Sequence, residues 1–255
     1  METLRIETRG AVTRLVLFRP EVRNAFNEIL IRELTAAFAS PPPGTRVAVL
    51  TGEGPVFCAG ADAEWMRRSR GYTEAENTRD AAAMAAMMRA IDECPVPVIA
   101  GVEGAALGGG SGLVAACDIA VASERAQFGF TEARLGLIPA VISTFVLPKI
   151  GPGAARRYFL TGERFGAREA LSMGLVHEVV ASDSLEERVQ AIAGEVLRCG
   201  PVAVTAAKRL LREVAGMTRG EAIDHTIRAI ARIRVSPEAQ EGLASFLEKR
   251  TPGWS

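Results

Sequence analysis

The sequence has few residues of the kinds that bind metals or form disulfides. Its 255 residues include two histidines and four cysteines, and no two cysteines form a C-x-x-C pair. The cysteines lie far apart, and only His177 and His225 could supply imidazole ligands. We therefore expect no metal site and no disulfide framework. Free cysteines are typical of a reducing compartment, so we predict a cytoplasmic protein.

The chain also lacks an excess of charge and a long apolar run. Thirty basic and thirty acidic residues give a formal net charge of zero, which argues against nucleic acid or an anionic membrane as a partner. No uninterrupted apolar stretch approaches the roughly 20 residues that cross a bilayer. Residues 1–20 mix Glu and Arg into their apolar positions, so we expect no secretory signal there.

Nearly half of the residues are hydrophobic, which is enough for a large buried core. Apolar and polar residues alternate in 4–8 and 11–18 around Gly10, which predicts a β-hairpin. Helical spacing follows in 28–38, and a short β-branched strand is expected at 46–51. The opening of the chain therefore predicts a sheet followed by a covering helix.

Strands and helices continue to alternate through the middle of the chain. We expect helices at 75–93 and 110–116 and strands at 96–100 and 118–122. This order predicts a layered α/β core over residues 1–182. Strand patterns then cease, and residues 183–255 form a predicted helical region with helices at 185–197, 202–214, 218–233 and 237–249.

Three segments have residues suited to chemistry, and the first is Phe57-Cys58-Ala59-Gly60-Ala61-Asp62. A strand followed by a small-residue turn and a helix leaves backbone N–H groups free to bind an anion or an oxyanion. The alternative is a tight turn in which Asp62 caps the following helix.

The second segment is Gly108-Gly109-Gly110-Ser111-Gly112, which opens a helix after a strand. A nucleophile elbow requires Gly two residues after its Ser, and Leu113 stands there instead. A P-loop requires Gly-Lys-Ser/Thr, which is absent, and a dinucleotide-binding turn requires a final Gly, where Leu113 also stands. A general oxyanion or phosphate turn remains, and a purely structural glycine turn is equally compatible with the sequence.

The third segment is 127–132, Gln-Phe-Gly-Phe-Thr-Glu. It sets a carboxyl group, Glu132, among apolar residues. Partial burial would raise the pKa of Glu132 toward the range useful for general acid/base chemistry. An ordinary surface glutamate is the alternative.

In this order and spacing the three segments resemble the crotonase (enoyl-CoA hydratase/isomerase) family. Arg19-Pro20 and Asn24-Ala25 near the start, and Glu241-Gly242, Phe246 and Glu248-Lys249-Arg250 near the end, extend the resemblance over nearly the whole chain. It implies a spiral of β-β-α units with C-terminal helices that form a homotrimer or homohexamer. It also implies an acyl-CoA thioester substrate and no separate cofactor.

The resemblance also implies the roles of particular residues. The N–H groups of Ala61 and Gly109 would bind the thioester carbonyl, and Glu132 would act as acid and base. Family hydratases usually carry a second glutamate, and Gly112 occupies that position here. Gly112 would leave room for a branched acyl group, as in bacterial enzymes that hydrate 3-methylglutaconyl-CoA.

Further residues are expected around the substrate. By the resemblance, the candidates for binding CoA are Arg23, Ala59, Phe246 and Lys249, the last two often serving a neighbouring subunit. Asp62, Gly108 and Gly112 complete the predicted substrate-binding set. The missing second glutamate leaves two alternatives to hydration: a 3,2-enoyl-CoA isomerase with one glutamate, or an acyl-CoA-binding protein without activity.

Overall fold

A six-stranded sheet forms the base of the molecule in the computed structural model, which describes residues 1–254. β1 and β2 pair antiparallel through a turn at Gly10, as the sequence predicted. The remaining neighbours in the order β1-β2-β3-β4-β6-β9 are parallel. The strands are β1 (Leu4–Arg9), β2 (Val12–Leu17), β3 (Val47–Gly52), β4 (Val98–Val102), β6 (Ile119–Ser123) and β9 (Glu178–Val180).

A smaller sheet in the order β5-β7-β8 carries two of the three chemical segments. Its strands are β5 (Ala105–Leu107), β7 (Gln127–Gly129) and β8 (Arg164–Gly166). β5 and β7 run parallel, and Leu107 is paired with Gly129. Their carboxyl ends therefore lie side by side, and the residues that follow them, Gly108 and Glu132, are brought into one place.

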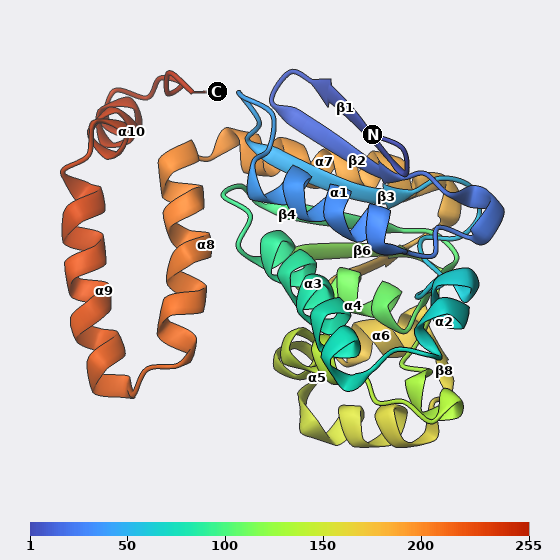
Figure 1. Ribbon diagram of the computed structural model, residues 1–255. Coiled ribbons are helices and arrows are strands. Elements are labelled where there is room, and N and C mark those ends of the chain that lie inside the picture. The colour runs from blue at the N-terminus through green and yellow to red at the C-terminus, as the bar shows by residue number, and fades with distance from the viewer. Residues whose placement is uncertain (255) are drawn as a thin grey trace.

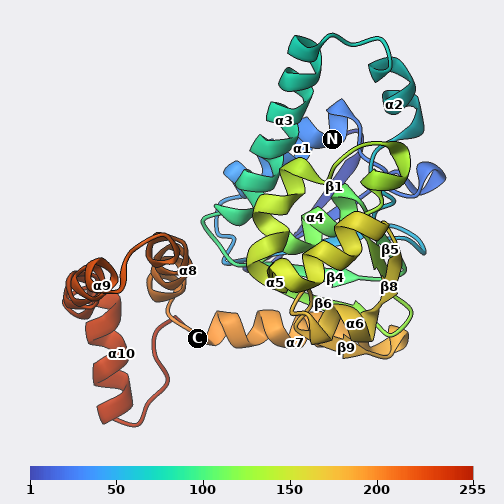
Figure 2. The same cartoon turned by 90° about the horizontal axis from the view of Figure 1, so that it is seen from below.

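Helices cover both faces of the larger sheet (Figures 1 and 2). On one face lie α1 (Glu28–Ala39), α3 (Glu74–Asp92) and α4 (Gly109–Ala116), and α5 (Ala140–Thr161) packs against α3 and α4. The apolar side chains of these helices join one large core cluster. On the other face α7 (Leu185–Arg198) packs Val189, Ile192 and Ala193 against the strands. The short helices α2 (Ala63–Ser69) and α6 (Ala167–Ser172) complete the core.

Three helices project from this core as an arm. They are α8 (Pro201–Ala215), α9 (Arg219–Arg234) and α10 (Pro237–Leu247), and Figure 1 shows them beside the core, connected to it through α7. α7 belongs to the predicted helical region 183–255 but packs on the sheet. The arm exposes apolar side chains, including Ile223, Ile227 and Ile230, and α9 has no buried residue.

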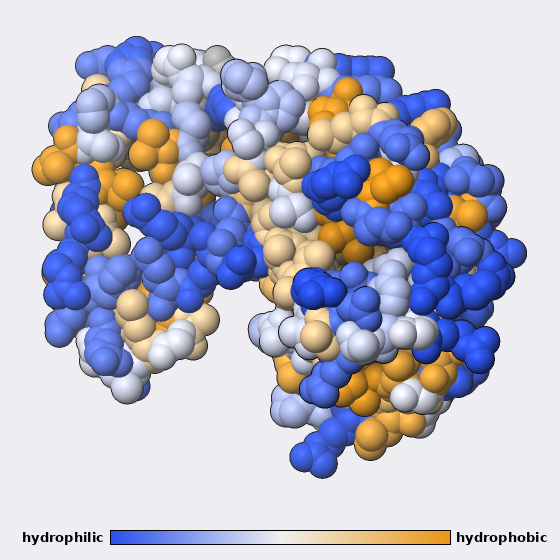
Figure 3. All heavy atoms as spheres, viewed as in Figure 1, coloured by the Kyte–Doolittle hydropathy of each residue, from blue (hydrophilic) through white to orange (hydrophobic). Residues whose placement is uncertain are grey.

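Figure 3 shows a hollow between the core and the arm that opens to one side, with mainly hydrophilic residues on the arm side and pale or apolar residues on the core side. Within residues 1–254, no helix combines the length and the apolar character required to cross a membrane. The architecture is the α/β spiral with C-terminal helices that the sequence predicted.

Candidate active site

The first free N–H group belongs to Ala61. Phe26 and Ala61 form an isolated parallel bridge in which the Phe26 N–H donates to Gly60 O at 2.8 Å and the Asp62 N–H donates to Phe26 O at 3.0 Å. Because successive N–H groups of an extended chain alternate in direction, the Ala61 N–H points away from Phe26. It has no hydrogen-bond acceptor in the described part of the chain.

The second free N–H group belongs to Gly109, the first residue of α4. An N–H at this position has no carbonyl of its own helix to bind, and no other acceptor within residues 1–254 takes it. The two turns are joined, since the Leu107 N–H donates to Cys58 O at 3.0 Å. A Cβ built on Gly60 would lie 4.0 Å from the Gly109 nitrogen, so the two turns approach closely.

Both turns need glycine because neighbouring atoms leave no room for a side chain. A Cβ on Gly109 would lie 2.2 Å from Cζ of Phe26, and one on Gly110 would lie 2.4 Å from Cys58 O. Gly108 has φ 53° and ψ −122°, a conformation that L side chains rarely adopt. These glycines let the N-terminus of α4 pack directly on the first turn, which is how two free donors come together.

Glu132 begins a 3₁₀ turn (Glu132–Leu135) that follows β7. Its carboxylate lies against Gly108, because a Cβ on Gly108 would be 3.1 Å from Oε1 of Glu132. Gly108 is held there by its own N–H, which donates to Gly129 O at 2.7 Å. The glutamate is therefore next to the residue that precedes the Gly109 donor.

The environment of Glu132 favours the protonated form. Oε2 is buried and has no hydrogen-bond partner within residues 1–254. Burial raises the pKa of Glu132 above its ordinary value, and a hydrogen bond from its own backbone N–H opposes this only in part. A carboxyl group of this kind can accept and return a proton at a substrate carbon or a water.

The space expected beside Gly112 does not exist. A Cβ on Gly112 would lie 2.4 Å from Cγ2 of Ile142 and 3.1 Å from Cε of Met88. Ile142, on α5, is 1% exposed and Met88, on α3, is fully buried. The interpretation that Gly112 leaves room for a branched acyl group is therefore wrong: the volume is filled by a side chain thirty residues away.

Asp62 is a structural residue. Its Oδ1 accepts hydrogen bonds from the N–H groups of Glu64 and Trp65 and caps α2, while Oδ2 pairs with Arg19 at 2.8 Å. Burial acts against ionisation, but these donors lower the pKa of Asp62 overall. The capping alternative is confirmed, and a contact of Asp62 with substrate stays a prediction.

Arg23 and Ala59 lie next to one another at the edge of the first turn. The Ala59 N–H donates to Arg23 O at 3.0 Å, and Arg23 is exposed in a left-handed conformation with φ 56°. Arg23 is thus free to meet an anionic group approaching the first turn. The Ala59 N–H is already engaged, which leaves its carbonyl for a ligand.

Sequence reasoning did not identify Asn24 as a site-supporting residue. Asn24 is fully buried, and its Nδ2 donates to Glu53 O at 2.9 Å and to Val56 O at 2.7 Å, while its Oδ1 accepts from the Arg19 N–H. It thereby fixes the loop that leads into the first turn. An asparagine just before an apolar pair is a weak signal, because the same residue also suits an exposed turn.

Phe246 and Lys249 belong to the arm and do not approach Glu132 of the same chain. α10 packs against α8 and α9, and Figure 2 shows the arm separated from α4 and β5 by the length of α7. Phe246 is 81% exposed. Their role in binding CoA, which the resemblance assigned to a neighbouring subunit, stays a prediction.

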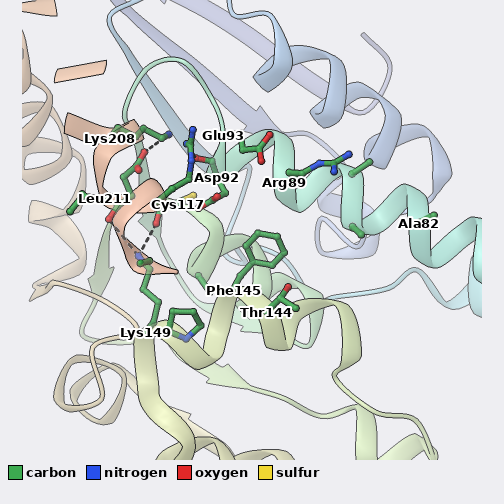
Figure 4. Close-up of a pocket in the computed structure, with 17 residues that line it drawn as sticks. Ala82, Arg89, Asp92, Glu93, Cys117, Thr144, Phe145, Lys149, Lys208 and Leu211 are labelled. Atoms are coloured by element: carbon green, nitrogen blue, oxygen red, sulfur yellow. Dashed lines mark hydrogen bonds and ion pairs between the residues drawn. The ribbon is translucent and has the colours of Figure 1, made fainter. Parts of the chain in front are cut away.

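A cleft of about 840 Å³ lies elsewhere, between α3, α5 and α8 (Figure 4). Among its lining residues, Lys208 pairs with Asp118 at 2.6 Å, and Lys149 donates to the backbone oxygen of Cys117 at 2.9 Å. Burial raises the pKa of the Cys117 thiol to about 12, so this cysteine is not a nucleophile. Neither Glu132 nor the two free N–H groups line this cleft.

Two neighbouring free N–H donors beside a buried carboxyl group form a site for moving a proton next to a carbonyl that becomes an oxyanion, and here Gly109 and Glu132 follow the paired strands β5 and β7. The chain belongs to the enoyl-CoA hydratase/isomerase family, whose sequence model matches residues 7–255.

Similar proteins agree with this assignment over almost their full lengths. The chain is 33% identical over 254 residues to a crotonyl-CoA hydratase of Syntrophomonas wolfei, covering 98% of this chain and 96% of that protein. It is 32% identical over 255 residues to a 2,3-dehydroadipyl-CoA hydratase of Escherichia coli, with 99% and 98% covered. The crystal structure of an enoyl-CoA hydratase from Shewanella pealeana superimposes with a TM-score of 0.94 at 41% identity, covering 99% and 96% of the two chains.

Proposed function

We propose that the protein is an enoyl-CoA hydratase that adds water to the C2–C3 double bond of a 2-enoyl-CoA thioester, with both new bonds on one face. The observation that carries the proposal is the unpartnered, buried Oε2 of Glu132, whose pKa is raised, beside the free N–H groups of Ala61 and Gly109. In this reaction Glu132 takes a proton from the water that attacks C3. It then returns a proton to C2.

The two N–H donors stabilise the intermediate charge. As water adds to C3, electron density moves to the thioester oxygen and forms an enolate. The Ala61 and Gly109 groups bind that oxygen, and Gly109 adds the partial positive charge of the α4 N-terminus. Removing one such donor from an enzyme typically costs about 3 kcal/mol of transition-state stabilisation.

The acyl group is the finer part of the proposal. The relatives named above include hydratases of a short apolar acyl-CoA and of an acyl-CoA with a distal carboxylate. Ile142 and Met88 fill the space over Gly112, so the reason for preferring a branched glutaconyl ester is gone. We therefore propose a linear 2-enoyl group, and retain 3-methylglutaconyl-CoA as the comparison substrate.

Isomerisation of a 3-enoyl-CoA is the second candidate. One observation favours it: position 112 supplies no second carboxyl group, and a single base suffices to move a proton between C2 and C4. Glu132 and the two N–H donors would then serve the same enolate without a water. The two reactions differ in their substrates and products, so they are separable by direct assay.

Binding of CoA and assembly complete the proposal. Arg23 is exposed beside the first turn and suits a phosphate of CoA. Phe246 and Lys249 are exposed on an arm with a broad apolar surface, and packing of that arm on other copies would bring them to a neighbouring site. We propose a homotrimer or a pair of trimers, and a reaction that needs no cofactor beyond the CoA of its substrate.

The proposal is tested by following crotonyl-CoA and 3-methylglutaconyl-CoA through loss of the ultraviolet absorbance of the conjugated thioester, with 3-hexenoyl-CoA as the isomerase substrate. Hydration predicts loss of absorbance with crotonyl-CoA and formation of the 3-hydroxyacyl ester, identified by mass. A gain of absorbance with 3-hexenoyl-CoA, and no reaction of crotonyl-CoA, would establish isomerisation instead. Binding of all three esters without turnover would identify an inactive binding protein.

A further inference from the structure

Ile142 of the core packs directly on Gly112 of α4. Gly108 precedes α4, and the Gly112 N–H donates to Gly108 O at 3.2 Å, so the two residues lie one helical turn apart. The carboxylate of Glu132 lies on Gly108. Gly112 therefore lies one helical turn from the residue that the carboxylate of Glu132 contacts.

That neighbouring position is closed by an apolar side chain. A Cβ on Gly112 would lie 2.4 Å from Cγ2 and 2.9 Å from Cβ of Ile142, with Met88 Cε at 3.1 Å. The Ile142 atoms belong to the base of the side chain, so they cannot move aside without a shift of α5. Ile142 is 1% exposed, which means that neither a side chain at 112 nor a water has room there.

We propose that Ile142 is a specificity-determining residue, which limits the acyl-CoA accepted by this site to chains without a branch at C3. The inference rests on the proposed function, because it takes C3 of the acyl group to lie between Glu132 and Ile142. A methyl branch at C3 would need the volume that Ile142 fills. Truncating Ile142 opens that volume. Gly112 has no side chain on α4 that could fill it.

The test is calorimetric binding of two unreactive esters, butyryl-CoA and 3-methylbutyryl-CoA, which differ by the branch alone. Ile142→Ala is expected to improve the affinity for the branched ester relative to the linear one by about tenfold or more, the usual effect of accommodating one methyl group in an apolar pocket. Ile150→Ala, a truncation of another buried isoleucine on α5, is the matched control and should leave the ratio unchanged.

A second pair of variants tests the contact itself. Gly112→Ala should lower the midpoint of thermal unfolding in the wild-type background, and should lower it less in Ile142→Ala, which removes Cγ2 at 2.4 Å and keeps Cβ at 2.9 Å. If Ile142→Ala does not fold, Ile142→Leu serves in its place, because leucine has no Cγ2 methyl group on Cβ, with a smaller expected change of the binding ratio.

The outcomes separate this inference from the proposed function. An unchanged binding ratio in folded Ile142→Ala, or an equal change in Ile150→Ala, would overturn the role of Ile142 even if crotonyl-CoA is hydrated. A tenfold change of the ratio would support it even if the wild-type protein proved to be an isomerase, since the two esters report on acyl binding and not on turnover.

Discussion

The carboxylate of Glu132 lies directly on the backbone of Gly108, where a single Cβ would come within 3.1 Å of Oε1. The next residue, Gly109, offers a free N–H group at the start of α4. One glycine thus separates the acid/base group from an oxyanion donor. This closeness allows one glutamate to act on carbons adjacent to a thioester carbonyl.

Gly108→Ala should impair both folding and catalysis. Its φ of 53° and ψ of −122° are strained for alanine, and the new Cβ would press on Glu132. We expect a loss of about 2 kcal/mol in the free energy of unfolding and a fall in kcat, measured by denaturant titration and steady-state assay. Gly194→Ala in α7, where nothing lies within 4 Å of the added Cβ, should be neutral or slightly stabilising. Equal losses in the two variants would contradict this account.

Activity should rise with pH as Glu132 loses its proton. A base acts only when deprotonated, and burial raises the pKa of Glu132 above the ordinary glutamate value of about 4.3. The acidic limb of kcat/KM for crotonyl-CoA should therefore be centred above that value. Because position 112 carries no carboxyl group, we expect a single ionisation on this limb. If kcat/KM instead falls with an apparent pKa at or below the ordinary glutamate value, the ionising group that controls activity is not the buried Glu132.

The same pKa predicts an effect on stability. The pKa of Glu132 is raised in the folded protein. The contribution of such a carboxyl group to folding stability is complete below its pKa in the unfolded protein, and it is lost as the pH rises through its pKa in the folded protein. Glu132→Gln removes this loss, so the variant should be more stable than wild type at neutral pH. The difference should disappear in acid, as thermal unfolding at several pH values would show. A difference that grows in acid would contradict the prediction.

The Arg19–Asp62 pair should be important for folding. Asp62 caps α2 and pairs with Arg19 at 2.8 Å, and both side chains are largely buried. Asp62→Asn leaves the arginine charge without its partner, for which we expect a loss of about 3 kcal/mol. The lowered pKa of Asp62 also means that its contribution is present above the unfolded pKa and is lost as pH falls through the folded one. Glu28→Gln, which breaks an exposed pair with Arg68, should change stability by less than about 1 kcal/mol.

Local patterns predicted most of the fold and the two donor turns. The opening hairpin, the helices around 28–38 and 75–93, and the C-terminal helices appear within a few residues of their expected ends. α5 was not predicted, because Pro148, Pro152 and Gly151 interrupt its pattern. In the structure it spans Ala140–Thr161 with non-helical angles at Gly151.

Long-range contacts explain what the sequence did not reveal about Gly112 and Asp62. Gly112 looked like an empty position because the isoleucine that fills it is far away in the sequence, on the helix that was not predicted. The ion pair of Asp62 with Arg19 was not predicted, because the position of Arg19 opposite its second oxygen depends on the folded chain. Its role as a helix cap was visible from the sequence, since the helix begins at the next residue.

The most direct test of the account is the rate of crotonyl-CoA hydration in Glu132→Gln compared with wild type. The account predicts a fall in kcat of about 10²–10⁴-fold, with butyryl-CoA bound by calorimetry as tightly as by wild type, because the donors at Ala61 and Gly109 are untouched. A variant that hydrates crotonyl-CoA at the wild-type rate would contradict the central claim that Glu132 moves the proton.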